Sequence, residues 1–380
     1  MDNSNEKLSD NCTVINEGKA QIIVKKKNVF YNPVQEFNRD LSIVVLTNYI
    51  KECLTNPIKK KNQVGNTDKK NDIRILEALS ATGLRSIRYA KEVSGIDEII
   101  ANDISCEAVN VIKENIIHNK VEQIVKANHE DATMTMYQNK KSKFDVIDLD
   151  PYGCPSIFLD SAVQSVKDNG LLFVTATDMA VLAGNSPETC YVKYGAISLK
   201  SKACHEIALR ILLQNIAAHA GRYGKVITPI LSVSADFYIR VFVKINTSPS
   251  ACKKNTSKLG MIYQCTGCKS VNVQPLGICP TEKSYKLPHA PVVDKLCNFC
   301  KSKNYMGGPI WTGPLHLKEV LHQLLDLVES DNSHIRDLNT LRRIHGVLSV
   351  VSEELDNPLY YTLDDIMSTV KCQMPPMVLW

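Results

Sequence analysis

The sequence lacks the long apolar segments that membrane-spanning and secreted proteins need. No window of its 380 residues approaches the ~18 consecutive apolar residues of a transmembrane helix. The first sixteen residues are polar and charged, and they contain no apolar core of a secretory signal. The sequence therefore predicts a protein without a membrane anchor that works in the nucleus or the cytoplasm.

The sequence also lacks the motifs of several common enzyme classes. It has no good match to the G-x-G-x-x-G loop of dinucleotide-binding proteins, no Ser/His/Asp order, no nucleophilic-cysteine motif and no internal repeat. Most of its thirteen cysteines stand singly in apolar stretches, which favours buried thiols in a reducing compartment. The net charge of +5 permits a polyanionic partner but does not require one.

What is present is an alternation of strand-like and helix-like segments. After a first apolar run at 18–24 and a helix-like stretch at 41–53, buried strand patterns alternate with helical ones, and two strands joined by a short connection follow. The expected strands are 73–79, 96–101, 121–125, 144–149, 171–175, 226–233 and 238–245, and the expected helices are 84–93, 107–119, 157–166 and 196–219. Such alternation predicts a parallel sheet with helices on both faces. A hairpin at the end of that sheet is typical of the Rossmann-like, seven-stranded class I methyltransferase fold.

A change of composition at 246–255, rich in Thr, Ser, Pro and Lys, indicates a domain boundary. We therefore predict a disordered tail at 1–16, a methyltransferase domain at 17–246 and a smaller α+β zinc-bearing domain at 256–380, with helices near 315–328 and 338–348. The Lys-rich stretch 56–72 has the composition of a solvated loop.

Polar residues follow the first three strands of the predicted sheet, where an open α/β sheet binds its ligands. The first strand leads into Glu77 and a turn at Gly83, an arrangement that suits a cofactor without phosphates such as S-adenosylmethionine. Asp103 follows the second strand, where a carboxylate binds ribose hydroxyls. Asp131 and Ala132 follow the third, where a carboxylate can accept from an adenine amino group. Helix capping is the competing interpretation of each aspartate.

The fourth strand ends in Asp150-Pro151-Tyr152-Gly153, which contains the groups that methylation of a base amine requires. The lone pair of an exocyclic amine is delocalised into the ring. A carboxylate and a backbone carbonyl that accept its two N–H bonds would aim the lone pair, and the carboxylate can take the proton. Proline fixes the turn, and the aromatic ring can stack on a base. A plain strand-ending turn is the alternative.

Four cysteines form two Cys-x-x-Cys pairs, Cys265 with Cys268 and Cys297 with Cys300. Each pair can present two thiolates to one tetrahedral ion, so the spacing predicts a closed structural Zn²⁺ site, with Cys279 as a possible substitute ligand. Basic residues also recur at 193–225, and a positive patch there would bind nucleic-acid phosphates, although a solvated surface is the simpler interpretation. These residues are Lys193, Lys200, Lys202, Arg210, Arg222 and Lys225.

Taken together, these motifs resemble the tRNA guanine-26 N2-dimethyltransferase family over about residues 17–370. The blocks that carry the resemblance are Glu17-Gly18-Lys19-Ala20, residues 32–40 (NPVQEFNRD), residues 81–85 (ATGLR), residues 148–153 (DLDPYG) and the paired Cys-x-x-Cys. The resemblance implies a tRNA substrate, S-adenosylmethionine as cofactor, one or two methyl transfers to guanine N2, and a protein that we expect to be a monomer.

The resemblance also implies roles for individual residues. The cofactor contacts would be Arg39, Arg85, Asp103, Asp131 and Ala132. Asp150 would activate the amine beside Pro151, and Phe30 and Tyr152 would hold the target base between them. Either arginine has the charge to bind the methionine carboxylate. Family members generally continue past the position of Trp380, which predicts a reduced C-terminal domain here.

Two other functions fit part of the pattern. Asp-Pro-Tyr chemistry also suits an adenine-N6 methyltransferase acting on DNA or ribosomal RNA, but the zinc domain and the N-terminal blocks argue against it. A non-catalytic, zinc-bearing RNA-binding adaptor is the other alternative, and the intact set of Asp103, Asp131 and Asp150 argues against that.

Overall fold

The computed structural model describes residues 12–25, 31–55, 73–281, 284–331 and 333–373, and the Lys-rich stretch 56–72 lies outside them. The chain forms two compact units. The first comprises Met1–Asp150, Gln164–Phe173 and Lys318–Glu354, and the second comprises Pro151–Val163, Val174–Leu317 and Leu355–Trp380. These units divide the chain differently from the predicted domains 17–246 and 256–380, because the helices of Lys318–Glu354 pack on a helix from the N-terminal part of the chain.

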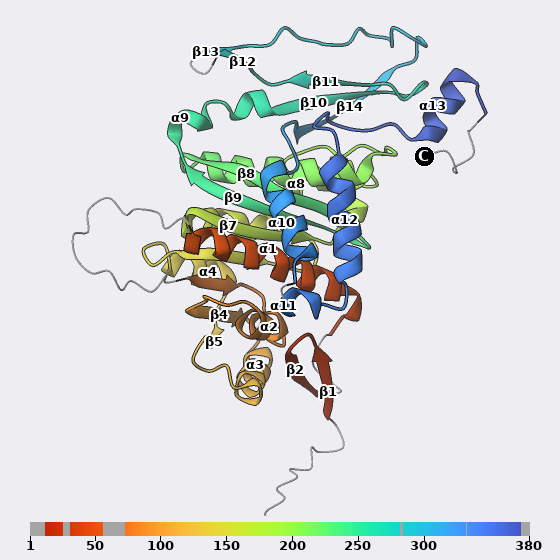
Figure 1. Cartoon of the computed structure of the whole chain (residues 1–380). Helices are drawn as coiled ribbons and strands as arrows, with labels where there is room; N and C mark the ends of the chain where they lie inside the picture. The colour runs from red at the N-terminus through yellow and green to blue at the C-terminus, as the bar shows by residue number, and fades with distance from the viewer. Residues whose placement is uncertain (1–11, 26–30, 56–72, 282–283, 332, 374–380) are drawn as a thin grey trace, which may run out of the picture. The chain divides into compact units, whose positions relative to one another are not determined.

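Seven strands form one mixed sheet in the order β5-β4-β3-β6-β7-β9-β8 (Figure 1). Strand β3 pairs in parallel with β4 and β6, β4 pairs in parallel with β5, and β8 and β9 form an antiparallel hairpin. The bounds are β3 Arg74–Glu77, β4 Glu98–Asp103, β5 Val125–His129, β6 Phe144–Leu149, β7 Val166–Ala176, β8 Lys225–Ala235 and β9 Tyr238–Thr247. Every residue of β6 is buried, as expected of a central parallel strand. The predicted fold class is confirmed.

The helices of the first unit follow the predicted pattern with longer or shifted ends. They are the 3-10 helix η1 Pro33–Gln35, α1 Glu36–Thr55, α2 Leu84–Glu92, α3 Cys106–Asn119, α4 Ala132–Gln138, α10 Lys318–Glu329, α11 Ser333–Arg336 and α12 Leu341–Glu353. Helix α1 packs against α10 and α12. The Asn48 amide donates to Gln323 at 3.0 Å, and the Asp40 carboxylate accepts from the Thr340 hydroxyl at 2.7 Å. These contacts place the C-terminal helices in the first unit.

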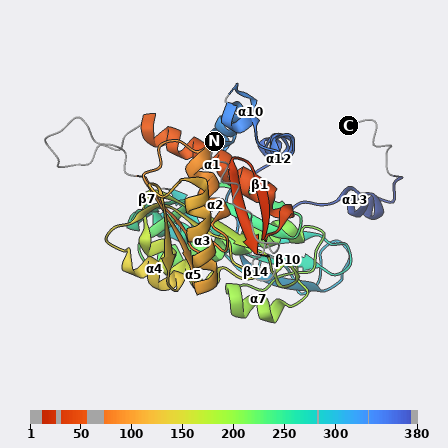
Figure 2. The ribbon, with the colours of Figure 1, turned by 90° about the horizontal axis from the view of Figure 1, so that it is seen from below.

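An antiparallel hairpin of β1 Cys12–Glu17 and β2 Ala20–Lys25 precedes η1, and β2 lies beside α2 and α3 (Figure 2). Asn115 and Asn119, one turn apart on α3, accept the backbone N–H groups of Ile23 at 2.8 Å and Gln21 at 3.0 Å. The tail was predicted to extend to residue 16, whereas β1 begins at Cys12, since it pairs with β2 along its whole length.

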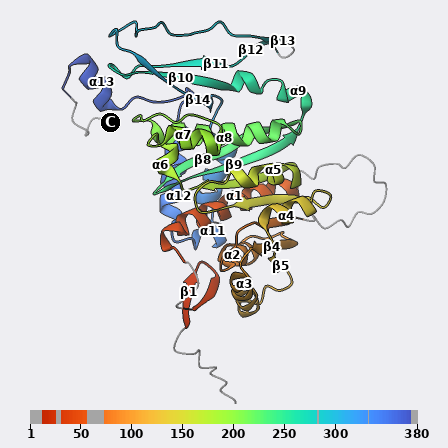
Figure 3. The same cartoon turned by 180° about the vertical axis from the view of Figure 1, so that it is seen from behind.

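In the second unit, α8 packs on β8, β9 and β14, and α6 and α7 lie beside α8 (Figure 3). Its helices are α5 Ser156–Ser165, α6 Met179–Leu182, α7 Pro187–Tyr194, α8 Cys204–Gly221, α9 Pro249–Cys252, η2 Asn255–Lys258 and α13 Leu363–Val370. The helix predicted at 196–219 begins only at Cys204. Gly195 ends α7 in a left-handed conformation, and Ile197 then forms a bridge with Gly308 instead of a helical turn.

The cysteine-containing region adds two small antiparallel sheets to the second unit. One has the order β11-β10-β14, from Leu259–Cys265 (β10), Val271–Pro275 (β11) and Asn304–Trp311 (β14). The other joins β12 Ile278–Thr281 to β13 Ser284–Lys286. Among the described residues of this region, few apolar side chains are buried, namely Ile262, Ile310 and Trp311 besides two cysteines.

Candidate active site and metal centre

The turn after β3 is held against the ends of its two neighbouring strands. The backbone N–H of Ala78 donates to the carbonyl of Asp148 at 3.1 Å, and that of Ser80 donates to the carbonyl of Asn102 at 2.8 Å. Gly83 has φ +75°, and a Cβ there would lie 3.2 Å from Ile112. Glycine is therefore needed at this position both for backbone conformation and for close approach to α3.

Asn102 links three strand ends, and the sequence analysis did not single it out. Its side-chain amide donates to the carbonyls of Ala78 at 3.0 Å and Glu130 at 3.1 Å, and its oxygen accepts from Asn128 at 2.7 Å and Thr135 at 3.1 Å. The residue is 1% exposed. Because two of these bonds are buried and the other two are partly buried, Asn102 fixes the spacing between the residues that follow β3, β4 and β5. Its position directly before Asp103 was the one signal in the sequence.

Asp103 and Asp131 both lie at the predicted strand ends. The Asp103 carboxylate accepts the N–H groups of Ala81 and Ser105, each at 2.9 Å. Among the described residues, these two N–H groups use two of its roughly four acceptor positions. Asp131 caps α4 by accepting from the Met134 N–H at 3.1 Å, and the next residue, Ala132, is 5% exposed. Asp131 is thus a helix cap, as the competing interpretation predicted, and its contact with the cofactor stays a prediction.

Arg85 on α2 is surrounded by three carboxylates. Its guanidinium lies 3.7 Å from Glu77 and 3.4 Å from Asp148, and it forms an ion pair with Asp150. Asp148 also accepts from the Tyr89 hydroxyl at 2.7 Å. Arg85 and Asp148 are buried, whereas the Asp150 side chain is 19% exposed. Of the three carboxylates, Asp150 is therefore the one that can reach a substrate, and Arg85 holds it in place.

The Glu77 carboxyl, beside Arg85 in this cluster, has a pKa shifted from its ordinary value. Burial raises the pKa of its carboxyl to about 7, against the opposing effects of the Arg85 charge and of a hydrogen bond from Ser86. Near neutral pH this group therefore changes charge beside Arg85. Arg85 bonds the Asn38 side chain at 3.0 Å and the Ser42 hydroxyl at 3.2 Å as well, so its guanidinium is engaged on several sides.

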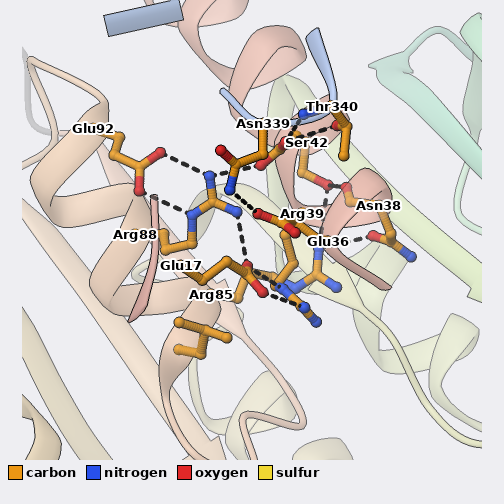
Figure 4. A network of polar contacts seen from close by, with 12 residues as sticks. Glu17, Glu36, Asn38, Arg39, Ser42, Arg85, Arg88, Glu92, Asn339 and Thr340 are labelled. Atoms are coloured by element: carbon orange, nitrogen blue, oxygen red, sulfur yellow. Dashed lines mark hydrogen bonds and ion pairs between the residues drawn. The ribbon is translucent and has the colours of Figure 1, made fainter. Parts of the chain in front are cut away.

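Arg39, the other arginine expected at the cofactor, is paired with Glu17 (Figure 4). Its Nε lies 2.6 Å from Glu17 Oε1, its Nη2 lies 2.5 Å from Oε2, and Nη2 also donates to the carbonyl of Asn32 at 3.1 Å. The guanidinium is stacked 5.6 Å from the centre of the Tyr31 ring. Both predicted arginines are thus positioned by internal acceptors.

The rest of the tetrapeptide belongs to the second unit. Pro151 is buried and Tyr152 is 75% exposed. Gly153, with φ +78°, exchanges two hydrogen bonds with Thr177, its N–H donating to the hydroxyl at 2.7 Å and its carbonyl accepting at 3.0 Å. The turn thus presents an exposed aromatic ring on a fixed backbone. Phe30, predicted as the second stacking residue, lies outside the described residues.

Beyond Thr177, a polar group that the sequence analysis missed lies within the second unit. The Tyr194 hydroxyl donates to Asp178, and Lys193 forms an ion pair with the same carboxylate at 3.1 Å. Burial, with the neighbouring Cys154 and the bond to Asp178, raises the pKa of the Tyr194 phenol. Tyr194 is therefore a neutral donor. Residues fifteen and sixteen positions apart meet here, which no local pattern indicates.

The predicted basic patch is only partly a surface. Arg210 is 2% exposed and donates to the carbonyls of Trp311 at 3.0 Å and Gly313 at 2.9 Å. Lys225 is 5% exposed and donates to the carbonyl of Val163. These two residues were wrongly assigned to a phosphate-binding surface, because each satisfies buried backbone carbonyls. Those that are exposed are Lys193, Lys200, Lys202 and Arg222.

The four predicted cysteines come together in one cluster. The sulfurs of Cys265, Cys268, Cys297 and Cys300 all lie within 4.8 Å of one another, with 3.3 Å between Cys265 and Cys300 and 3.7 Å between Cys268 and Cys297. A tetrahedral ion with metal–sulfur bonds of 2.3 Å requires sulfurs about 3.8 Å apart. The thiol of Cys279 instead donates to the carbonyl of Thr281 at 3.0 Å. The residues fit a four-cysteine metal site.

The backbone repeats the same turn around each cysteine pair. The N–H of Cys265 donates to Ser270 at 2.9 Å, and that of Cys297 donates to Ser302 at 2.8 Å. Hydrogen bonds from Ser302 lower the pKa of the Cys300 thiol to about 6, which favours the thiolate. A Cβ at Gly267 would lie 2.9 Å from the Cys300 sulfur, so only glycine allows the two turns to approach.

The strand order defines the class of protein. The first strand of the sheet is flanked by the second and the fourth, and a reversed hairpin lies at the far edge, as in a class I methyltransferase. Polar residues stand at the strand ends where an open α/β sheet binds its ligands. The model of the N2,N2-dimethylguanosine tRNA methyltransferase family matches residues 11–379. The chain belongs to this family, as its motifs predicted, and it is by that membership an S-adenosylmethionine-dependent tRNA methyltransferase.

Individual relatives agree with the family assignment. The tRNA (guanine(26)-N(2))-dimethyltransferase of Drosophila melanogaster is 48% identical over 97% of this chain and 69% of its own length. The Homo sapiens protein of that name is 41% identical over 96% of this chain and 62% of its own. A structure of Trm1 from Pyrococcus horikoshii with S-adenosyl-L-methionine has a TM-score of 0.75 and 32% identity, covering 94% of this chain and 88% of that one. The chain thus spans about two thirds of the length of these eukaryotic relatives.

Proposed function

We propose that the chain transfers methyl groups from S-adenosylmethionine to the exocyclic N2 of guanine 26 in tRNA, making both the mono- and the dimethylated base. The observation that carries this proposal is Asp150, a partly exposed carboxylate at the end of β6 that is held by Arg85 and followed by Pro151 and the exposed Tyr152. The printed names of the relatives, which specify guanine 26 and dimethylation, support the position and the extent of methylation.

In the proposed reaction, the chain aims and deprotonates the amine. The sulfonium of S-adenosylmethionine supplies an electrophilic methyl group when bound. The Asp150 carboxylate accepts one N2–H bond and the backbone carbonyl at Pro151 accepts the other, so that the nitrogen lone pair faces the methyl group. The methyl group would pass from the cofactor sulfur to N2, the sulfur–methyl bond breaking to leave S-adenosylhomocysteine, and Asp150 would take the amine proton. Tyr152 stacks on the guanine, together with Phe30.

The proposed cofactor contacts follow the strand ends. Asp103 would accept the ribose hydroxyls, Asp131 and the backbone at Ala132 would meet the adenine, and Arg39 and Arg85 would face the methionine carboxylate. The Asp103 carboxylate, which accepts only two N–H groups among the described residues, supports this arrangement. The Pyrococcus horikoshii Trm1 structure, 32% identical to this chain, is a complex with S-adenosyl-L-methionine, which supports the same cofactor here.

We also propose that the cysteine cluster holds a structural Zn²⁺ ion. Four thiolates would fill a tetrahedral coordination shell and leave no position for water or substrate, so the ion would stabilise the region around β10 and β14 without entering the reaction. We retain the sequence-based division into a catalytic part at 17–246 and a zinc-bearing, tRNA-binding part at 256–380 as a prediction about function, in addition to the compact units described above. A monomeric state is likewise a prediction.

None of the helices in the described part of the chain combines the length and apolarity that a membrane span requires. We propose that the protein works in the nucleus or the cytoplasm. One relative, from Saccharomyces cerevisiae, is described as mitochondrial and is 42% identical over 96% of this chain. Fluorescence microscopy of the tagged chain in its own cells would distinguish the three compartments.

The test of the proposed function is nucleoside mass spectrometry of tRNA from a host that lacks its own enzyme. The parent chain should produce N2-methylguanosine and N2,N2-dimethylguanosine. Asp150→Ala should lower turnover by about 10²-fold or more with nearly unchanged cofactor affinity, because a general base and an orienting acceptor are both lost.

Asp148→Asn is the matched control for that experiment. Asp148 contacts Arg85 as Asp150 does, but its side chain is fully buried, so the variant should lose stability and keep more turnover. Equal loss of turnover in both variants would show that the effect passes through Arg85. N6-methyladenine as the product, or no methylation by the parent chain, would favour the two alternative functions.

A further inference from the structure

We propose that Glu17, at the end of β1, is a positioning residue for the active site. Its carboxylate fixes the Arg39 guanidinium and the backbone that directly follows Phe30. This inference rests on the proposed function, because Arg39 is expected to face the cofactor and Phe30 the target base. It assigns to the N-terminal hairpin a part in the reaction as well as in the fold.

The Glu17 carboxylate is saturated with donors. Oε1 accepts from Arg39 Nε at 2.6 Å and from Arg88 Nη1 at 2.8 Å. Oε2 accepts from Arg39 Nη2 at 2.5 Å and from the Tyr31 hydroxyl at 3.1 Å. Glu17 is 1% exposed. Four bonds occupy the roughly four acceptor positions of a carboxylate, so the group has one orientation in which all donors are satisfied.

These bonds reach the backbone on both sides of the η1 turn. Arg39 Nη2 also donates to the Asn32 carbonyl at 3.1 Å, and the Asn32 side chain in turn accepts from the Val34 N–H at 3.0 Å. Tyr31 is held twice, through its hydroxyl on Glu17 and through its ring beneath Arg39. The two residues that follow Phe30 are therefore fixed by the Glu17–Arg39 pair.

Glu17 is itself held from the other side by Arg88, which is 1% exposed (Figure 4). Arg88 forms ion pairs with Asp40 at 2.7 Å and with Glu92 at 2.9 Å, besides the one with Glu17. One buried guanidinium thus joins β1, α1 and α2. Removing one charge from such a network would leave another charge buried without a partner, which destabilises the fold. The network therefore favours one arrangement of these side chains.

The hairpin turn is shaped to fit this network. Gly18 has φ +53°, and a Cβ there would lie 2.3 Å from Glu92 Oε1 and 2.8 Å from Arg88 Nε. The Lys19 N–H donates to Glu92 at 3.0 Å. Farther along β2, Asn115 accepts from the Ile23 N–H and donates to the Thr82 carbonyl at 3.0 Å in the turn after β3. The hairpin is therefore connected to the cofactor turn as well as to Arg39.

The pKa shifts of Glu17 and Tyr31 keep the carboxylate charged and the phenol neutral at neutral pH, as their hydrogen bond requires. Although burial acts to raise it, the pKa of the Glu17 carboxyl is lowered by Arg39 and Arg88. Burial and the Glu17 charge raise the pKa of Tyr31 to about 12, so its hydroxyl stays a donor at neutral pH.

The experiment compares Glu17→Gln with Glu92→Gln in the full chain. Glutamine replaces one acceptor oxygen with a donor facing the arginines. Glu17→Gln should weaken S-adenosylmethionine binding, measured by calorimetry, by about ten-fold or more, and should lower kcat/KM for tRNA at least as much. Glu92 accepts from Arg88 and from the Lys19 N–H rather than from Arg39. Glu92→Gln should therefore lower Tm about as much as Glu17→Gln does, and it should leave cofactor affinity near the parent value.

Equal effects of the two variants on cofactor affinity, or parent-like binding and turnover by Glu17→Gln, would overturn the inference. If Glu17→Gln does not fold, Tyr31→Phe decides, because it removes one donor to Glu17 and keeps the ring. That variant should lower kcat on tRNA several-fold with unchanged cofactor affinity, and parent-like kcat would refute the proposal. Failure of the proposed function would look different, since the parent chain itself would then not methylate guanine.

Discussion

The strand ends of the first unit and the cysteine cluster of the second are held together by different forces. At the strand ends, Asn102, Asp103 and Arg85 are fixed by hydrogen bonds and ion pairs between elements that already pack through buried apolar side chains. Around the cysteines, few apolar side chains of the described residues are buried. The first site is therefore preorganised by the protein, whereas the second would gain its core from the Zn²⁺ ion that we propose for it.

This contrast predicts that metal removal destabilises the cysteine region and leaves the strand-end site intact. The effect on the cysteine region is the largest that we expect. Cys297→Ser, or chelation of the parent, should unfold residues near β10 and β14 with a loss of several kcal/mol, because metal binding and folding are coupled there. Elemental analysis should find stoichiometric zinc in the parent and little in the variant. S-adenosylmethionine affinity should survive.

Cys279→Ser is the matched control for the metal experiment, since the Cys279 thiol bonds Thr281 outside the cluster. It should keep zinc and stability. Zinc retained by Cys297→Ser but lost by Cys279→Ser would make Cys279 a ligand, and parent protein without stoichiometric metal would remove the contrast between the two regions.

A second prediction concerns pH and the strand-end site alone. The pKa of Glu77 is raised in the folded protein to about 7 from an ordinary value of 4.5. The unfolded chain therefore loses this proton first, and stability falls as pH rises from about 4.5 to 7, by about 3 kcal/mol in all. Glu77→Gln should remove that decline, which denaturant unfolding at several pH values would measure.

Glu98, on β4 of the same sheet, should behave oppositely. Although burial acts to raise it, bonds from Lys126 and Arg74 lower the pKa of Glu98. Its stabilising contribution is present above pH 4.5 and is lost as pH falls, so Glu98→Gln should reduce stability at neutral pH.

If stability depends on pH in the same way in Glu77→Gln and in the parent, the Glu77 carboxyl is not buried as described.

The smallest predicted effect is on cofactor affinity. Asp103→Ala should weaken S-adenosylmethionine binding by about 1–3 kcal/mol, because the ribose hydroxyls and the Ala81 N–H lose an acceptor. Asp97→Ala is the control. Asp97 accepts the Ile73 N–H at 2.9 Å near the opposite end of β4, so this variant should reduce stability but not affinity. Calorimetry that finds equal affinities for Asp103→Ala and the parent would exclude Asp103 from the cofactor site.

Local patterns predicted most elements and many of the candidate residues, but not their boundaries or partners. The strand β6 lies at its predicted bounds, since a buried run ended by Asp-Pro is unambiguous. The strand predicted at 121–125 lies instead at Val125–His129, because its pairing with β4 decides the register. The helix predicted from residue 196 begins only at Cys204, because Ile197 forms a tertiary bridge with Gly308 instead of a helical turn.

By itself, the sequence determined the fold class, the family, the strand-end aspartates and the four cysteines, because each depends on periodicity or spacing along the chain. Only the tertiary structure decided which charges meet. Glu17 bonds Arg39, which lies 22 positions farther along the chain, and Arg88, which lies 71 positions farther. Arg210 and Lys225, expected at the surface, are buried. A buried ion pair has no signature in the chain, since its energy depends on desolvation and on partners that only folding brings within reach.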